Sequence, residues 1–434
     1  MTYEESLTYI HSRKRFCGEP TLERMAELMC RMGDPQKKLK FVHIAGTNGK
    51  GSTTAMTANV LRHAGYKTGQ YISPFVLCFR ERMQIDGEMI LEEELAQITA
   101  QVKLHCDAME NETCGYAPTE FEVVTAIALE WFARRGCDIV CLEVGLGGRF
   151  DATNVIDPPL VQVIMSISLD HTAILGDTVS QIAFEKCGII KGGVTVCYPL
   201  QEIDTLSTIM EQCAQKGSTL IQPNVNSITM RSEALFRTCF CYGDLEITPS
   251  LAGEHQVYNA VTVVEICRQL RAQGFGIKDS DIVQGIASTR FPARMELLSD
   301  KPLIVLDGAH NPSGAQVLER VLEQLGEHKI TVMMGMLTDK DWKHSAACIA
   351  RHAARFIAVT PQSARALPAA ELAETAKIHC ADVQSYESIP QALHLAVENL
   401  CADDVLVVCG SLYLAAQVRP QLLEYTVQSR KATE

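Results

Sequence analysis

The sequence predicts an α/β protein with two domains. We expect a larger N-terminal domain built on a mostly parallel sheet, followed by a smaller, Rossmann-like C-terminal domain. Short apolar runs rich in β-branched residues alternate with amphipathic stretches, which is the pattern of strands joined by helices. The chain has 434 residues, which is more than one hydrophobic core usually supports.

The N-terminal part contains four runs that we expect to be strands. They are Lys40–Ala45, Asp138–Val144, Leu160–Ile167 and Val194–Tyr198. Helices are expected at Ser52–Ala64, which Gly65 would cap, and at Glu120–Arg135, whose apolar side chains recur on one face. This alternation is typical of a parallel sheet covered by helices.

A second set of expected strands begins at Pro302, and each of them is followed by a helical stretch. They are Pro302–Asp307, Ile330–Met336, Arg355–Thr360 and Val405–Gly410. The segment Ser288–Lys301 contains proline, serine and aspartate and is the expected junction. We therefore predict one domain at residues 1–293 and a second at residues 294–434.

The composition argues against several classes of protein. With 39 basic and 52 acidic residues the formal net charge is −13, so no nucleic-acid-binding face is expected. The N-terminus is polar, unlike a signal peptide, and no apolar run approaches the ~20 residues of a membrane span. The 17 cysteines include no Cys-x-x-Cys pair, so we expect reduced thiols. No sustained heptad pattern is present, and the prediction is a cytoplasmic monomer.

The strongest motif is a glycine-rich loop, Gly46-Thr47-Asn48-Gly49-Lys50-Gly51-Ser52, between an expected strand and an expected helix. In such a loop the backbone N–H groups point at phosphate, the lysine adds positive charge and the helix N-terminus adds its dipole. We therefore predict a P-loop ATPase domain. The loop departs from the common G-x-x-x-x-G-K-[ST] form at Ile44 and Gly51, so a magnesium ligand has to come from elsewhere.

Three other strand ends carry side chains suited to a metal ion. Ser73 follows a short strand, Glu143 lies near the end of the 138–144 run, and His171 follows the 160–167 run. Ligand groups gather beyond the carboxyl ends of parallel strands, and Mg²⁺ prefers hard oxygen ligands. From the residues alone, His171 can equally be a structural or solvated loop residue. On the same basis Lys186 is interpreted as a solvated helix lysine.

Together with further segments, these motifs make the chain recognisable. The matching segments include HIAGTNGKGS, PTEFEVVTAIA, LGGRFDATN, SLDHTAILGDT, FEKCGIIK, GEHQVYNA, FPARME, LDGAHNP and CGSLYL, and they span almost the whole chain. The sequence resembles folylpolyglutamate synthases, within the Mur ligase superfamily of ATP-dependent, amide-forming enzymes. The resemblance implies a ligase that adds L-glutamate to the γ-carboxylate of folate and uses ATP and two Mg²⁺ ions. By likeness alone it also implies activation by K⁺.

The resemblance implies roles for individual residues. The family's metal ligands fall on Ser73, Glu143, His171 and Lys186, the last as a carbamate derived from CO₂. The implied ATP-binding residues are Thr47, Asn48, Gly49, Lys50, Gly51, Ser52, Asn259, Arg294 and Asp307. The implied catalytic residues are Lys50, Lys186, His171 and His310.

The substrates are expected in two places. The resemblance implies that folate lies near Arg80, Arg82 and Phe121, and that Ser411 and His310 line the cleft where glutamate enters. From the residues alone, the two arginines can also be surface charges that flank a loop. Many relatives carry a histidine after Ser73-Pro74, where this chain has Phe75, so the exact folate contacts stay open.

The resemblance also implies a mechanism. The folate carboxylate attacks the γ-phosphate of ATP, and the amine of glutamate then attacks the acyl phosphate, with the domains closed against water. The alternatives are a dihydrofolate synthase, which joins dihydropteroate to glutamate, and a bifunctional enzyme. A cell-wall precursor ligase fits LGGRFDATN poorly. A P-loop regulatory ATPase would leave Lys186, LDGAHNP and CGSLYL without a purpose.

Overall fold

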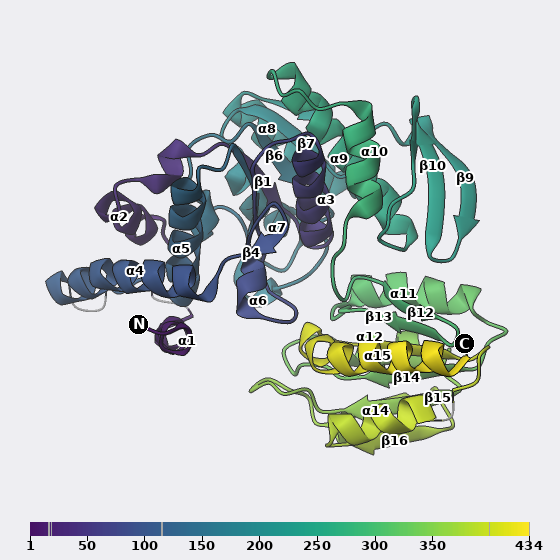
Figure 1. Cartoon of the computed structure of the whole chain (residues 1–434). Helices are drawn as coiled ribbons and strands as arrows, with labels where there is room; N and C mark the ends of the chain where they lie inside the picture. Colours follow the sequence, from purple (N-terminus) through teal and green to yellow (C-terminus); the bar gives the residue numbers. More distant parts are fainter. Residues whose placement is uncertain (16–17, 19, 114–115, 399, 434) are drawn as a thin grey trace. The chain divides into compact units, whose positions relative to one another are not determined.

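The computed structural model describes residues 1–434 apart from 16–17, 19, 114–115, 399 and 434 (Figure 1). It divides into two compact units. Unit 1 comprises Met1–Thr229, Phe240–Thr248 and Val257–Thr289, and unit 2 comprises Met230–Cys239, Pro249–Gln256 and Arg290–Glu434. The chain thus passes into unit 2 near residue 290, and two shorter segments before that point also belong to unit 2.

Unit 1 is built on an eight-stranded sheet of order β4-β3-β2-β5-β1-β6-β7-β8. The strands are β1 (Phe41–Ala45), β2 (Thr68–Tyr71), β3 (Met83–Ile85), β4 (Glu88–Met89), β5 (Ile139–Glu143), β6 (Val161–Ile164), β7 (Gly193–Cys197) and β8 (Ser218–Ile221). The neighbouring strands β2, β5, β1, β6, β7 and β8 are parallel, while β3 and β4 form an antiparallel edge. Strand β1 therefore lies in the middle of the parallel part.

The predicted strands of unit 1 are confirmed. Strands β1, β5 and β6 are shorter than their predicted runs, and β7 has the predicted length but begins one residue earlier. Every residue of β1, β5 and β6 is buried. Strands buried on both faces read as continuous apolar runs, and periodicity cannot mark where such a run stops being a strand. Strand β2 ends at Tyr71, so Ser73 lies two residues beyond it, in a loop.

Helices cover both faces of this sheet. They are α1 (Tyr3–Ser12), α2 (Glu23–Arg31), α3 (Lys50–His63), α4 (Glu92–Glu112), α5 (Glu120–Arg135), α6 (Thr172–Leu175), α7 (Val179–Lys186), α8 (Ile203–Lys216), α9 (Glu254–Ala272) and α10 (Asp279–Ser288). One apolar core lies under α4 and α5, and another lies under α3, α9 and α10. The phosphate loop joins β1 to α3 and is therefore held between two buried elements.

The predicted helix Glu120–Arg135 is confirmed as α5, but its burial extends beyond the one apolar face that we expected. Besides the predicted face, Val123, Ala126, Leu129 and Phe132 are also buried. The reason is that α5 packs against helices α1, α2 and α4 and against two short 3-10 helices, η1 (Pro35–Lys38) and η3 (Ala152–Val155). Figure 1 shows that α4 and α1 lie close to α5. A helix enclosed in this way is apolar nearly all round.

Unit 2 has a six-stranded sheet of order β12-β13-β17-β14-β15-β16, parallel except for β12. Its strands are β12 (Glu296–Asp300), β13 (Leu303–Leu306), β14 (Ile330–Met334), β15 (Arg355–Val359), β16 (Val383–Tyr386) and β17 (Val405–Cys409). Its helices are α11 (Pro312–Gln324), α12 (Trp342–Ala350), α13 (Ala369–Ala376), α14 (Ile389–Glu398) and α15 (Leu412–Thr433). This arrangement confirms the predicted fold class and the four predicted strands.

Three further strands, β9 (Ile228–Ala234), β10 (Arg237–Tyr242) and β11 (Leu245–Ile247), form a small sheet of order β11-β10-β9. Strands β12 and β16 have partly exposed residues, and we did not predict them. Within the described residues, no helix is both long and apolar enough to cross a bilayer.

A buried histidine lies in the central strand. His43 of β1 is fully buried, and its Nε2 lies 2.9 Å from Thr153 Oγ1. Burial, and then the positive charge of Lys191, lowers the pKa of His43 to about 3. The ring is therefore neutral in the folded protein at any pH above that value.

This histidine should make the stability of the protein depend on pH. Between pH ~3 and ~6.5 the unfolded chain binds a proton that folded His43 does not, so stability falls as pH falls through this window, by about 1.4 kcal/mol per pH unit. In His43→Gln, the free energy of unfolding from urea titrations between pH 5.5 and 4 should fall less steeply by about that slope. The same replacement at the exposed His379 is the control. An unchanged slope in His43→Gln would show that this ring is not held neutral.

Candidate active site

Two glycines shape the phosphate loop. A Cβ on Gly46 would lie 2.6 Å from the Cβ of Met165, so only glycine fits at that position. Gly49 caps α3 with φ of 84°, a left-handed conformation that costs an L-residue roughly 1–2 kcal/mol. A Cβ at Gly49 would also lie 2.7 Å from Oδ1 of Asn259. At Gly46 and Gly49 the loop therefore has room for backbone atoms only.

The loop is tied to the segment that follows β6. The N–H groups of Thr47 and Asn48 donate to the Ser166 carbonyl at 2.8 and 3.2 Å. The Thr47 hydroxyl both accepts from the Ser168 N–H and donates to its carbonyl, each at 3.1 Å. Lys50 donates from Nζ back to the loop carbonyls of Gly46 and Thr47, at 2.9 and 3.1 Å. Lys50 thus lies over the loop where phosphate would bind.

Lys186 reaches the same carbonyl from α7. Its Nζ donates to the Gly46 carbonyl at 2.8 Å, and the residue is 5% exposed. Burial, followed by the charge of Lys50, lowers the pKa of Lys186 to about 7, although Asp170 and Asp151 act in the opposite direction. The interpretation of Lys186 as a solvated helix lysine is therefore wrong. The residue pattern misled because α7 turns its last residue inward.

Glu143 and Ser73 lie on the strands beside the loop. Strand β5 pairs with β1 so that Glu143 is opposite Ile44, and Glu143 is 5% exposed. Its Oε2 accepts from the Ser73 N–H at 3.2 Å, and the Ser73 Oγ accepts from Arg82 Nη1 at 2.9 Å. Because β2, β5, β1 and β6 are parallel neighbours, the loops that carry these groups leave the sheet at one edge.

His171 differs from the other expected metal ligands in its exposure. It follows β6 and precedes α6 in a left-handed conformation, with φ of 52°. Its side chain is 45% exposed, and Nε2 lies 3.9 Å from Asp170 Oδ2. This residue therefore stands at the solvent side of the strand-end groups.

The donor set suits magnesium. A hydroxyl at Ser73 and a carboxylate at Glu143 are hard oxygen donors, as Mg²⁺ prefers. A buried lysine that loses its proton readily can react with CO₂, and the resulting carbamate would add an anionic oxygen beside the phosphate loop. The residues present therefore fit a magnesium site at this edge of the sheet.

The expected folate residues are held in different ways. Arg80 donates to the Ile90 carbonyl at 3.1 Å and pairs with Glu92 at 3.3 Å, so it is bound to the segment at the start of α4. The guanidinium of Arg82 lies over the rings of Phe75 and Phe79, at 5.2 and 5.8 Å from their centroids. Of the two arginines, Arg82 is the one that contacts another expected site residue.

Phe121 and Asn259 both approach backbone of the candidate site. The ring of Phe121 lies where a Cβ on Gly145 would come within 2.4 Å, so it packs on the loop that follows β5. Asn259 is 2% exposed on α9 and borders the phosphate loop at Gly49. Both side chains are therefore in place beside the loops of unit 1.

The remaining expected residues belong to unit 2. Buried Asp307 accepts from the N–H groups of Met295 and Ala309 at 2.7 and 2.8 Å, and burial raises its pKa. His310 lies 2.9 Å from the Gly308 carbonyl through Nδ1, and Ser411 accepts from the Leu414 N–H at 3.1 Å. Arg294 lies near Phe291, with Cζ 5.9 Å from the ring centroid. The side chains of Asp307 and Ser411 thus accept hydrogen bonds from backbone N–H groups of unit 2.

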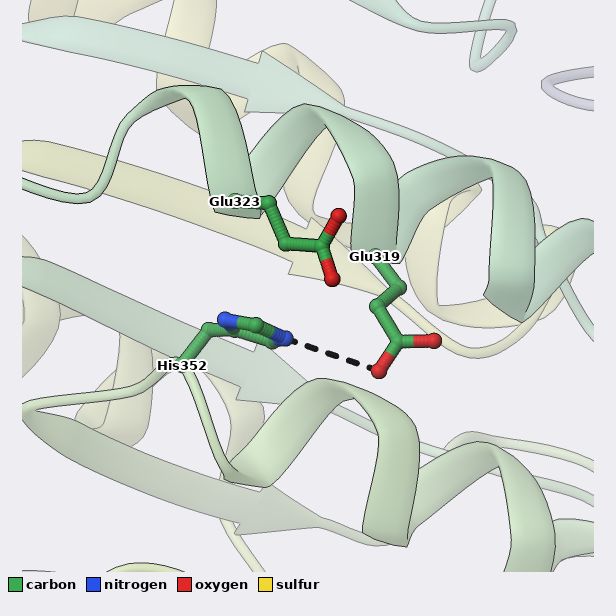
Figure 2. Close-up of side chains that lie close together, drawn as sticks. All are labelled: Glu319, Glu323 and His352. Atoms are coloured by element: carbon green, nitrogen blue, oxygen red, sulfur yellow. Dashed lines mark ion pairs between the residues drawn. The ribbon is translucent and has the colours of Figure 1, made fainter.

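A separate group of possible metal ligands occurs in unit 2. Glu319, Glu323 and His352 place one ligand atom each within 4.8 Å of the others, and Figure 2 shows the three side chains pointing toward one another. Glu319 already pairs with His352 at 3.5 Å and with Arg351 at 3.3 Å. Since a guanidinium already supplies positive charge to this group, we interpret it as an ion-pair cluster.

Sequence reasoning missed several residues that hold the site together. Asn154 donates to the Gly188 carbonyl near Lys186, Lys191 donates to the Asn154 carbonyl, and Asp151 accepts from the N–H groups of Thr153 and Leu146. Asp151 and Asn154 lie in the LGGRFDATN motif, which was noticed only as a matching segment. A polar run directly after a buried strand and its glycines was the signal that could have found them.

Comparison with known proteins agrees with this geometry. Residues 44–267 match the Mur ligase middle domain, and residues 293–412 match the glutamate ligase domain of Mur ligases. The dihydrofolate synthase/folylpolyglutamate synthase of Bacillus subtilis is 34% identical over 434 residues, covering 97% of this chain and 99% of its own. The chain belongs to the folylpolyglutamate synthase family.

Solved folylpolyglutamate synthase relatives share the whole fold. The Escherichia coli FolC structure, in complex with DHPP and ADP, superposes with a TM-score of 0.84 at 29% identity and covers 99% of both chains. The Mycobacterium tuberculosis folylpolyglutamate synthase complexed with ADP gives 0.87 at 27% identity, covering 97% of this chain and 98% of its own. The chain is thus an ATP-dependent ligase, as predicted, and the regulatory ATPase alternative does not fit the folylpolyglutamate synthase family.

The shape of the phosphate loop can be tested at Gly49. In Gly49→Ala the new Cβ would meet the Asn259 amide, so we expect at least about tenfold weaker binding of ADP, measured by calorimetry. Gly65 has the same φ of 84° with no atom within 4 Å of its Cβ position, so Gly65→Ala carries the backbone strain alone. Equal affinity of both variants for ADP would contradict the proposed fit of this loop to phosphate.

Proposed function

We propose that this protein joins L-glutamate to the γ-carboxylate of a folate through an acyl phosphate, with ATP as the phosphoryl donor. The observation that carries the proposal is the meeting of Lys50 and Lys186 at the Gly46 carbonyl, one strand away from Glu143. It places a phosphate-binding cation and a readily deprotonated amine at one loop. The likeness to folylpolyglutamate synthases over nearly the whole chain supports the substrates.

The nucleotide would lie on the phosphate loop. The N–H groups at the start of α3, with Lys50 and Ser52, would hold the phosphates, and Asn259 would meet the adenine. Arg294 and Asp307 would complete the nucleotide site. Ser73, Glu143, His171 and a carbamate on Lys186 would hold Mg²⁺, which supplies neutralisation of the charge that moves between phosphate oxygens.

The surroundings of Lys186 support the proposed carbamate. With a pKa of about 7, roughly half of its amine is neutral at pH 7, whereas an ordinary lysine is neutral in roughly one molecule in a few thousand. The neutral nitrogen attacks CO₂, a C–N bond forms and the nitrogen loses a proton. The product carries a negative charge on oxygen in place of the positive ammonium.

The reaction itself needs two displacements. An oxygen of the folate carboxylate attacks the γ-phosphorus, and the bond to the departing ADP oxygen breaks. The amine of glutamate then attacks the acyl carbon, inorganic phosphate leaves, and the amine gives up a proton. Arg82, Arg80 and Phe121 would hold the folate, and Ser411 would help bind glutamate.

His310 is the proposed acceptor of the amine proton. The Gly308 carbonyl can only accept, so the His310 Nδ1 carries a proton, and a neutral ring then has its lone pair on Nε2. We expect His310→Ala to lose turnover and to change the dependence of kcat on pH, measured over pH 6–9. A variant whose pH profile matches that of the wild type would assign the proton to another group.

A second activity is favoured by one specific observation. The similar protein of Bacillus subtilis carries the names of both dihydrofolate synthase and folylpolyglutamate synthase. We propose the same pair of activities here, since both need the same acyl phosphate and the same amine. We further propose a cytoplasmic monomer whose rate depends on K⁺.

One assay tests the function directly. Purified protein receives ATP, Mg²⁺, labelled glutamate and either tetrahydrofolate or dihydropteroate. We expect phosphate release that needs both glutamate and a folate-type acceptor, and label that appears in the acceptor. Release without either acceptor would overturn the ligase. Label in only one acceptor would decide between the two synthase activities.

Lys186 can be tested separately. Lys186→Arg keeps a positive charge but cannot form a carbamate, so we expect it to bind ADP normally and to lose turnover at least about a hundredfold. Lys186→Met, which has an uncharged and unbranched side chain, tests whether removing the positive charge of Lys186→Arg recovers any turnover. Near wild-type turnover in Lys186→Arg would exclude the carbamate and leave the ligase assignment standing.

A further inference from the structure

Two segments far apart in the sequence hold the backbone that carries Lys186. We call them the loop segment, Gly148–Ile156, and the lysine segment, Glu185–Lys191. The Arg149 N–H of the loop segment donates to the Glu185 carbonyl at 2.9 Å. The two backbones are therefore joined one residue before the lysine.

Glycines allow the two backbones to touch. A Cβ on Gly148 would lie 2.6 Å from the Lys186 carbonyl oxygen, and a Cβ on Gly188 would lie 2.3 Å from the Cα of Arg149. Neither neighbour is a flexible side chain that could move aside. At these two glycines the segments thus pack backbone against backbone, and polar side chains elsewhere link them.

Asn154 is the side chain that bridges both backbones. Its Nδ2 donates to the Arg149 carbonyl of the loop segment at 3.0 Å and to the Gly188 carbonyl of the lysine segment at 3.1 Å. The residue is 5% exposed, and its Oδ1 is buried with no hydrogen-bond partner among the described residues. A buried unsatisfied oxygen costs roughly 1–3 kcal/mol. The side chain therefore acts through its two donor hydrogens.

Lys191, in the lysine segment, donates to carbonyls of the loop segment. Its Nζ donates to the carbonyls of Asn154 and Ile156, at 2.7 and 2.5 Å. Bonds from an ammonium to carbonyls are stronger than those between neutral groups. Burial lowers the pKa of Lys191 to about 8, because a buried position disfavours the charged ammonium. The Asn154 amide and the Lys191 ammonium are thus both buried at some energetic cost, and both link the loop segment to the lysine segment.

We infer that Asn154 and Lys191 are positioning residues that hold Lys186 against the phosphate loop. The inference rests on the proposed role of Lys186. A buried amine is more stable in water, so it would withdraw into solvent if its backbone could move. The contact between the two segments opposes that movement. A displacement of about 1 Å at a reacting group can cost about a hundredfold in rate.

The test compares two asparagines. Asn154→Ala removes the bridge, and Asn59→Ala is the matched control, because Asn59 also donates from Nδ2 to a distant carbonyl, that of Gly285, at 2.7 Å. Both variants are measured for kcat, for KM of ATP, and for Tm. Hydrogen exchange of peptides covering 184–192 reports the lysine segment. Trapping with an oxonium alkylating reagent and mass spectrometry reports any carbamate on Lys186.

For Asn154→Ala we expect kcat to fall by about tenfold to a hundredfold with KM for ATP within about twofold. We also expect faster exchange at 184–192 and less trapped carbamate. Asn59→Ala should lower Tm alone. If Asn154→Ala changes kcat and exchange no more than Asn59→Ala does, the positioning role is wrong.

Two further results separate this inference from the proposed function. If wild-type Lys186 yields no trapped carbamate while Asn154→Ala still loses kcat and gains exchange, the carbamate is wrong and the positioning role stands. If Asn154→Ala does not fold, Lys191→Met, which removes the other side of the contact, takes its place with the same expected results. Unchanged kcat and exchange in Lys191→Met would then overturn the inference.

Discussion

The structure of the candidate site depends on one carbonyl oxygen. Lys50 and Lys186 both donate to Gly46, at 2.9 and 2.8 Å, so two amines share one acceptor. Two unit charges about 4 Å apart repel by about 4 kcal/mol at an effective dielectric of 20. Burial first, and then this repulsion, lower the pKa of Lys186, so the pair consists of one cation and one amine that is readily neutral. The same oxygen therefore fixes the positions of both amines, the one proposed to bind phosphate and the one proposed to form a carbamate.

The sheet order explains why the other groups are close by. Strand β1 lies between β5 and β6, and β2 lies beyond β5, all of them parallel. The loops after these strands therefore leave the sheet at one edge, with Glu143 and Ser73 on one side of the phosphate loop and His171 on the other. The Ser73 hydroxyl has two lone pairs, and the Arg82 bond uses one of them. The second lone pair of Ser73 is the one that would bind the proposed metal ion.

Much of this could be predicted from the sequence, because the signals were local. The phosphate loop has a strand before it and a helix after it, and Glu143 ends an otherwise apolar strand. Lys186 could not be identified from its own residues, since it lies buried where two segments distant in the sequence meet, at Gly148 and Gly188. The all-round burial of α5 likewise depends on helices α1, α2 and α4, which no periodicity within α5 reveals. Long-range contacts decided both cases.

The net charge of −13 makes the local cations more important. Triphosphate, folate and glutamate are anions, so the field of the whole chain opposes their approach, and nearby positive groups must overcome it. Lys50 lies over the loop, and Arg82 is held between Ser73 and two aromatic rings. A second permanent ammonium beside Lys50 would attract phosphate but repel the magnesium that accompanies it. An amine that can change from cation to anion, as proposed for Lys186, removes this conflict, because one lysine then serves phosphate and the other serves the metal.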